Sequence, residues 1–455
     1  MNESTTDNAK LSRVFADGAW VAVAQLVSVV AAVWFSIVSA RTLGVDGFAS
    51  LIWVLSVALF LGAVARFGSM QSAARIVSLS AGNTRVAIIR LFVGPLLFGL
   101  AASALWLVWL GGFLVERSNN PELYGQVDAL VAIWLPTATL FPVVAATLRA
   151  IGAFKESTLF NEGLRRITMS LVLLSVASAV PSELVRITVI VVVVVEALAI
   201  AVGFFLALRL TERGLDTERD PDTEVRPYAK DFTESLGFWP TSVVALVLPQ
   251  SGGWILAIVA VSQEVADFGL ALQVSMLFSL PFVIGSRVYV PRIARSHVSG
   301  TLERLEVGLR SFATASLGAI GVGILVFAIV GQWLVEAVFG AAFSGAYVVT
   351  LVLSVGAVAN ASTGLCMAVL ANSGSARVVA WSSVVAAAVF VPATLVLGAR
   401  FGATGAALAA STTQVLWNAV MVNVSTTRTG IRTSATLRPT KQRPSEADPT
   451  SRSMA

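Results

Sequence analysis

Side chains that carry out chemistry are scarce in this chain. Asp, Glu, Lys and Arg together make up 13% of its 455 residues, and histidine and cysteine each occur once, as His297 and Cys366. One cysteine excludes a disulfide framework and a thiolate metal cluster, and one histidine excludes a multi-histidine metal site. The lysines are also few, and none of them closes the Gly-rich loop that cradles ATP phosphates: Lys10, Lys155, Lys230 and Lys441. We therefore expect no enzyme, no cofactor and no bound metal.

Hydrophobic residues dominate instead, at 56% of the chain with a mean hydropathy of +0.83. A hydrocarbon core about 30 Å thick is crossed by about 20 apolar helical residues. The apolar blocks have this length and predict an all-α polytopic membrane protein with about twelve spans. The expected spans are Phe15–Ala40, Phe48–Ala65, Val86–Leu110, Val127–Leu148, Leu164–Val180, Ile187–Leu208, Leu236–Val261, Phe268–Val290, Val307–Val330, Tyr347–Ala371, Val378–Leu397 and Phe401–Val424.

The basic residues fall in alternate gaps between these spans. If the N-terminus is cytoplasmic, the inside segments carry 27 Lys and Arg residues and the outside loops carry 4. Cytoplasmic loops collect positive charge, so this asymmetry predicts a multi-pass protein of the cytoplasmic membrane with both termini inside. The sequence pI of about 9.8 then reflects topology and not nucleic-acid binding.

The chain divides into two similar halves. We expect a six-helix bundle over residues 1–209, a charged cytoplasmic linker over 210–235, a second six-helix bundle over 236–424, and a disordered cytoplasmic tail over 425–455. An offset of 220 positions pairs Ala40 with Ala260 and Phe48 with Phe268. Because six spans return the chain to the same side, the repeats run parallel, as in transporters built from two bundles.

Glu196 is the most unusual residue within a span. It interrupts a run of valines near the middle of the sixth span, where an ionisable side chain is costly and usually faces a cavity or a partner. Two interpretations stand side by side: a carboxyl held by a neighbouring helix for packing, or a group that couples proton movement to transport.

Other polar residues are candidates for substrate contact. Gln25 and Gln250 lie within the first and seventh spans, where each could contact substrate or form an interhelical hydrogen bond. Arginines at the mouths of a central cleft would suit a diphosphate, because a guanidinium binds phosphate oxygens in a bidentate manner. The alternative for each is a contact that only fixes topology. The candidate arginines are Arg66, Arg75, Arg41, Arg149 and Arg287.

Several loose motifs occur in an order and spacing that resemble the polysaccharide-exporter branch of the multidrug/oligosaccharidyl-lipid/polysaccharide flippase superfamily. The resemblance extends from about Ser12 to Asn423. Its motifs are Ala40-Arg41-Thr42-Leu43-Gly44 with Gly47-Phe48, Ala73-Ala74-Arg75, Leu148-Arg149-Ala150-Ile151-Gly152, Val290-Pro291-Arg292-Ile293, and Gly402-Ala403-Thr404-Gly405-Ala406-Ala407.

The resemblance implies a V-shaped pair of bundles that rock by alternating access around a central cavity. It also implies a flippase that moves undecaprenyl-diphosphate-linked oligosaccharide across the cytoplasmic membrane for the cell envelope. Its implied partners are that glycan, the bilayer, and membrane proteins that polymerise or transfer glycans. The seventh span departs from the pattern, since Pro249-Gln250-Ser251-Gly252-Gly253 stands where relatives often carry an acid.

Two other functions remain open at this point. A proton- or sodium-coupled drug or cation antiporter of the same superfamily would use a buried carboxylate, but the preference for arginine near the spans favours an anionic substrate. A membrane glycan polymerase or ligase would be expected to hold its active site in a large outer loop. The longest outer loop expected here, Gly111–Gln126, is short for that purpose.

Overall fold

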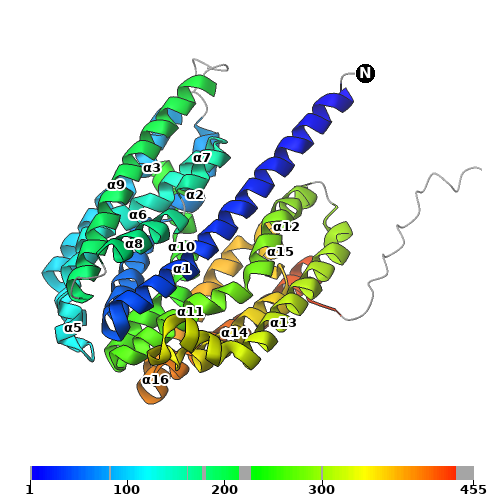
Figure 1. Ribbon diagram of the computed structural model, residues 1–455. Helices are drawn as coiled ribbons and strands as arrows, with labels where there is room; N and C mark the ends of the chain where they lie inside the picture. Colours follow the sequence, from blue (N-terminus) through cyan, green and yellow to red (C-terminus); the bar gives the residue numbers. More distant parts are fainter. Residues whose placement is uncertain are drawn as a thin grey trace, which may run out of the picture.

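The computed structural model describes residues 3–80, 84–160, 162–176, 181–214, 227–298 and 301–436. Every regular element within these ranges is a helix (Figure 1). In the first half the elements are α1 (Glu3–Ala65), α2 (Ser69–Leu79), α3 (Thr84–Leu105), a π-helical turn (Trp106–Leu110), α4 (Gly111–Arg117), α5 (Pro121–Gly125), α6 (Asp128–Ala150), α7 (Phe154–Leu159), α8 (Glu162–Ser175) and α9 (Pro181–Gly214).

The second half contains a similar number of elements. They are α10 (Tyr228–Val259), α11 (Ser262–Phe278), α12 (Leu280–Val298), a 3₁₀ turn (Leu302–Leu305), α13 (Glu306–Phe339), a second 3₁₀ turn (Ala341–Phe343), α14 (Ala346–Thr363), α15 (Cys366–Leu370), a π-helical turn (Ala371–Ser375) and α16 (Ala376–Thr429).

Several of these helices are long and apolar enough to cross a membrane. Among the described residues there are 7 such helices, or up to 8 if the bent pair α11 and α12 counts as one span. Two of the 7 stretches, Val27–Ser78 and Arg377–Thr429, have 52 and 53 residues, which is more than two crossings require. The prediction of an all-helical polytopic membrane protein is confirmed.

Glycines divide the longest helices. α1 bends at Gly44 (φ 65°, ψ −169°) and α16 bends at Gly402 (φ 58°, ψ −138°), two backbone conformations that only glycine adopts readily. The equivalent break in the second half separates α10 from α11 at residues 260 and 261, close to the position that an offset of 220 assigns to the bend in α1.

The two halves form two groups of helices that approach each other at one end and separate at the other (Figure 1). α1, in blue, runs between them and packs on α6 and α8 of its own half and on α10 and α11 of the other. The largest buried core includes residues of both halves, among them Trp53 and Phe268. We call the two ends of the molecule the converging end and the diverging end.

Polar contacts join the halves at the converging end. Arg41 Nε donates to the carbonyl of Val338 over 2.7 Å, and its Nη2 donates to the carbonyl of Ala337. The hydroxyl of Ser262 donates to Asp46 Oδ1 over 2.5 Å. These contacts connect both segments that flank the Gly44 bend to the second half.

The structure differs from the expected linker and tail at their boundaries. α9 continues to Gly214 and α10 begins at Tyr228, so both ends of the expected linker are helical, while residues 215–226 lie outside the described residues. Residues 425–429 belong to α16, and Ile431 is buried beyond it. The amide of Thr436 donates to Thr314 Oγ1 over 3.0 Å. The tail was therefore predicted to begin too early, and residues 437–455 lie outside the described residues.

Candidate functional site

A cavity lies between the two halves. Its volume is about 570 Å³, including the part that opens to solvent, and its walls come from α1, α8, α10 and α11. Most of the lining is apolar or small, and the long polar side chains in it are Arg165, Arg166 and Gln273. We call this space the central cavity.

Arg166 joins the halves across this cavity. It lies in the second turn of α8, and its Nη1 donates to Gln273 Oε1 on α11 over 3.0 Å. This contact pairs a guanidinium with a neutral amide oxygen. Arg166 therefore spans the central cavity from α8 to α11.

Arg165 points in a different direction, as adjacent residues of a helix must. Its Nε donates to Glu196 Oε1 on α9, and the two side chains are 1% and 2% exposed. The indole Nε1 of Trp134 on α6 donates to Glu196 Oε2 over 2.9 Å, and the guanidinium lies 5.5 Å from the ring centroids of Trp134 and Phe141. An ion pair, a hydrogen bond and cation–π contacts thus tie α6, α8 and α9 together.

These contacts give Glu196 a buried partner of opposite charge. Two neighbouring helices supply its partners, a cation on α8 and a neutral indole donor on α6. A role of Glu196 in coupling stays a prediction. Any proton that reached Glu196 would have to displace Arg165 or leave it without its counter-charge.

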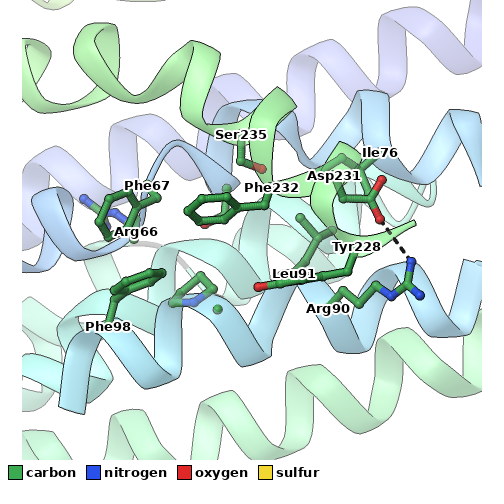
Figure 2. Close-up of a pocket in the computed structure, with 13 residues that line it drawn as sticks. Arg66, Phe67, Ile76, Arg90, Leu91, Phe98, Tyr228, Asp231, Phe232 and Ser235 are labelled. Carbon is green, nitrogen blue, oxygen red and sulfur yellow. Dashed lines mark hydrogen bonds and ion pairs between the residues drawn. The ribbon is translucent and has the colours of Figure 1, made fainter. Parts of the chain in front are cut away.

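A second pocket lies where α10 meets α2 and α3. It is about 360 Å³ in volume, again including open space, and Figure 2 shows Arg66 at one side of it, beside Phe67. Arg66 is 7% exposed at the end of α1, so the structure places this candidate residue in the α10 pocket and not in the central cavity.

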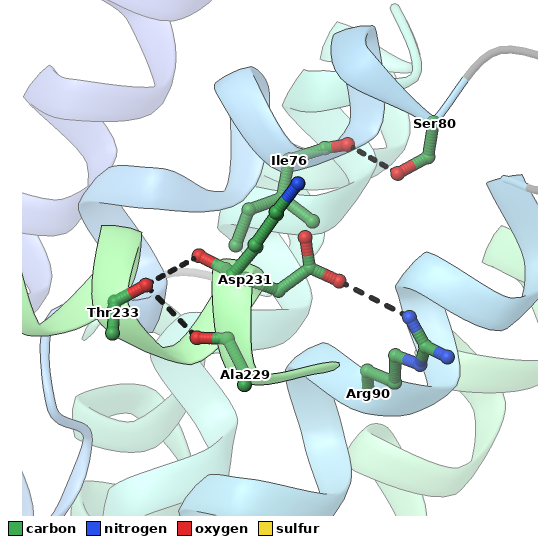
Figure 3. A network of polar contacts seen from close by, with 7 residues as sticks. Ile76, Ser80, Arg90, Ala229, Asp231 and Thr233 are labelled. Carbon is green, nitrogen blue, oxygen red and sulfur yellow. Dashed lines mark hydrogen bonds and ion pairs between the residues drawn. The ribbon is translucent and has the colours of Figure 1, made fainter. Parts of the chain in front are cut away.

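The α10 pocket is held together by aromatic and polar contacts between the halves. Phe67 stacks on Trp239 with ring centroids 5.3 Å apart. Arg90 Nη1 lies 3.4 Å from Asp231 Oδ2, and Figures 2 and 3 show this ion pair between α3 and α10. Phe67 is also the only described residue other than glycine with a positive φ, 46°. The start of α10 is therefore attached to the first half.

The remaining candidates lie elsewhere. Arg75 is exposed on α2, and Arg41 makes the converging-end contacts described above. Arg149 and Arg287, on different halves, are close enough for their charges to interact. The side chains of Gln25 and Gln250 lie outside the part of the chain whose side chains are described.

Sequence reasoning missed the arginines of the central cavity. Arg165 and Arg166 stand in the first turn of the expected span Leu164–Val180, where charges at a span end are usually interfacial. Because they lie inside that expected span and not in a loop, they could have been recognised as candidates for a cavity. Gln273 offered a weaker signal, as the single amide of the expected span Phe268–Val290.

No protein-family model matches the chain, and no curated protein sequence matches it. Solved structures do resemble it. A lipid II flippase MurJ in an inward closed conformation superposes with a TM-score of 0.68 at 13% identity, over 88% of this chain and 86% of that one. An inward-facing multidrug resistance MATE family transporter of the MOP superfamily gives 0.63 at 13% identity, over 89% and 94%.

A third similar structure is a MOP superfamily transporter from Pyrococcus furiosus, described as having a binding pocket of reverse polarity. Its TM-score is 0.56 at 12% identity, over 90% of this chain and 95% of that one. At such identities the likeness concerns the fold. This chain therefore has the fold that is seen in the lipid II flippase and in these MOP superfamily transporters.

Proposed function

We propose that this protein is a flippase that moves an undecaprenyl-diphosphate-linked oligosaccharide across the cytoplasmic membrane by alternating access. In this proposal both termini are cytoplasmic, and the diverging end faces the cytoplasm, where the substrate enters. Membrane proteins that polymerise or transfer glycans would act on the same substrate. The structural similarity to a protein named as a lipid II flippase supports this choice.

The observation that carries the proposal is the chemistry of the central cavity. Two consecutive arginines, Arg165 and Arg166, line it, and its described lining contains no carboxylate. Guanidinium groups bind diphosphate oxygens through bidentate, charge-assisted hydrogen bonds. Arg166 reaches across this cavity to Gln273 on the other half, so it is the residue best placed to contact an anionic group there.

The test replaces Arg166 in proteoliposomes supplied with a fluorescent prenyl-diphosphate-linked oligosaccharide. A lost charge-assisted contact costs about 1.5–3 kcal/mol, so Arg166→Ala should slow translocation roughly 10- to 150-fold. Arg166→Lys should recover part of the rate, because a lysine keeps the charge without the bidentate geometry. Arg186→Ala is the matched control, since Arg186 is 60% exposed and far from the cavity lining.

An unchanged rate in Arg166→Ala would remove this residue from the site. Arg66→Ala and Arg75→Ala, the arginines favoured by the sequence, belong in the same series. A slow rate in either of those variants with a normal rate in Arg166→Ala would move the diphosphate contact to the α10 pocket or to α2.

A proton- or sodium-coupled antiporter for cationic drugs is the second candidate, because MATE multidrug transporters share the fold. A cationic substrate would need a carboxylate or an aromatic face in the cavity. The same proteoliposomes distinguish the two functions when a lipophilic cation and an imposed proton or sodium gradient replace the glycolipid. Gradient-driven cation transport without glycolipid translocation would favour the antiporter.

A further inference from the structure

A third cavity lies within the second half, between α11, α14 and α16. Its volume is about 820 Å³, including open space. Its described lining contains neither a charged nor an aromatic side chain. The polar residues in the lining are Ser275, Ser279, Asn360, Ser411 and Gln414. We call this space the amide cavity.

Two of these polar groups are occupied by the backbone and three are not. The hydroxyl of Ser275 donates to Leu272 O over 2.9 Å, and the hydroxyl of Ser411 is likewise used within the fold. The side-chain amides of Asn360 and Gln414 and the hydroxyl of Ser279 make no hydrogen bond with any described residue. Amides at the depth of a membrane span are costly to leave unsatisfied, so they require water or a ligand.

The amide cavity adjoins the central cavity along one face of α11. Leu272 lines both spaces. Phe268 precedes it by four residues in the central cavity, and Ser275, Met276 and Ser279 follow it by three, four and seven in the amide cavity. These spacings place all five residues on one helical stripe. A ligand that touches Arg166 can therefore extend along α11 into the amide cavity.

We infer that the amide cavity binds the neutral sugar part of the lipid-linked substrate, while the central cavity binds its diphosphate. This inference rests on the proposed function. Sugars carry many hydroxyl groups, which both donate and accept hydrogen bonds, and primary amides do the same. A phosphate group would be expected to bind Lys or Arg, and a cation would be expected to bind an acidic side chain or an aromatic ring. The described lining contains none of these side chains.

The test measures binding of two probes to the full-length protein in detergent micelles. One probe is farnesyl diphosphate, and the other is farnesyl diphosphate that carries a neutral trisaccharide. Wild type should bind the glycosylated probe more tightly. The double variant Asn360→Leu/Gln414→Leu keeps the side chains at about the same size and removes both amides. In it, the ratio of the affinity for the glycosylated probe to that for farnesyl diphosphate should fall about tenfold, as expected for the loss of two ordinary hydrogen bonds.

The double variant should bind unglycosylated farnesyl diphosphate as tightly as wild type does. This unchanged binding also shows that the double variant has folded. Asn423→Leu, an exposed position on α16 outside the cavity, is the matched control and should bind both probes as wild type does.

Three results separate the possible failures. If wild type binds neither probe, the proposed function fails together with the inference. If it binds both equally, or if the double variant keeps the sugar advantage, the diphosphate site stands and the amide cavity is not a sugar site. If the double variant binds neither probe, Asn360→Leu and Gln414→Leu are measured as single variants. If neither single variant binds farnesyl diphosphate, the separation into a diphosphate site and a sugar site is wrong.

Discussion

A buried ion pair is costly to break from one side, and Arg165 with Glu196 is such a pair. Glu196→Gln keeps the shape and can still accept from Trp134, but it leaves the guanidinium of Arg165, 1% exposed, without its counter-charge. Removing one partner of a buried pair typically costs about 3–5 kcal/mol. We therefore expect a lower apparent Tm for Glu196→Gln, measured by tryptophan fluorescence in detergent.

A surface pair provides the control for that measurement. Glu183 and Arg186 are 58% and 60% exposed, with charged atoms 3.8 Å apart, so Glu183→Gln should change stability by less than about 0.5 kcal/mol. Replacing both buried partners, as in Arg165→Met/Glu196→Leu, should restore much of the loss. Equal Tm values for Glu196→Gln and wild type would show that the pair does not stabilise the fold. Coupling by Glu196 is a separate question, addressed by the pH dependence of transport in whatever fraction of the variant folds.

At the level of helices, the two glycine bends are not equivalent. Both Gly44 and Gly402 have a positive φ, and a side chain in such a conformation costs about 1–3 kcal/mol. At Gly44 an added Cβ would meet nothing within 4 Å. At Gly402 it would meet the carboxylate of Glu264, whose Oε2 accepts from the amide of Ala403 over 2.6 Å and so caps the second part of α16.

Gly402→Ala should therefore destabilise the protein more than Gly44→Ala, which serves as its control for backbone strain alone. Heating a detergent extract and measuring the soluble, monodisperse fraction compares the two. If Gly44→Ala lost as much of its soluble fraction as Gly402→Ala, or more, the expected order would be wrong.

The helices were predictable because hydropathy reports directly on membrane depth. The bend at Gly44 falls in an expected gap between spans, and Gly402 lies two residues inside the expected span Phe401–Val424. The start of α10 at Tyr228 was missed, because its first turns are polar and pack on the first half by way of Asp231. Hydropathy carries no information on such a contact.

The site was predictable only in part, for a related reason. Glu196 was visible as a carboxylate inside an apolar run, but its partner depends on how α8 is rotated against α9, which the sequence of neither helix specifies. The same holds for Arg166 and Gln273, which lie on different halves. Residues 430–436 were missed because only Ile431 among them is strongly hydrophobic, and hydrogen bonds such as Ala435 N to Ser362 O at 2.8 Å also hold them in place.

For the whole molecule, alternating access requires the converging end to open. The oxygens of Asp46 and Ser262 lie 2.5 Å apart there, on opposite halves. In a Cys366→Ala background, oxidation of Asp46→Cys/Ser262→Cys should join the halves and stop translocation, and a reductant should restore it. Glycolipid translocation in proteoliposomes before and after reduction measures this effect.

A pair elsewhere between α2 and α10 provides the comparison. The hydroxyls of Ser72 and Ser235 lie 2.7 Å apart, where the start of α10 is attached to the first half. A disulfide in Ser72→Cys/Ser235→Cys should leave translocation nearly unchanged if this part of α10 moves with that half. Normal translocation through a fully formed disulfide at Asp46 and Ser262 would contradict rocking about the central cavity.

The contact between Arg166 and Gln273 has a consequence for kinetics. A hydrogen bond between a charged and a neutral group contributes about 1.5–3 kcal/mol, which corresponds to roughly a 10- to 150-fold bias in the populations of two states. With a bias of that size, the state in which Arg166 and Gln273 are apart is still reached by thermal motion, on the microsecond to millisecond scale of domain motions. A diphosphate that drew Arg166 away from Gln273 would remove this contact and lower the barrier to its separation. The empty transporter would then stay longer in the conformation described here than the transporter with bound substrate.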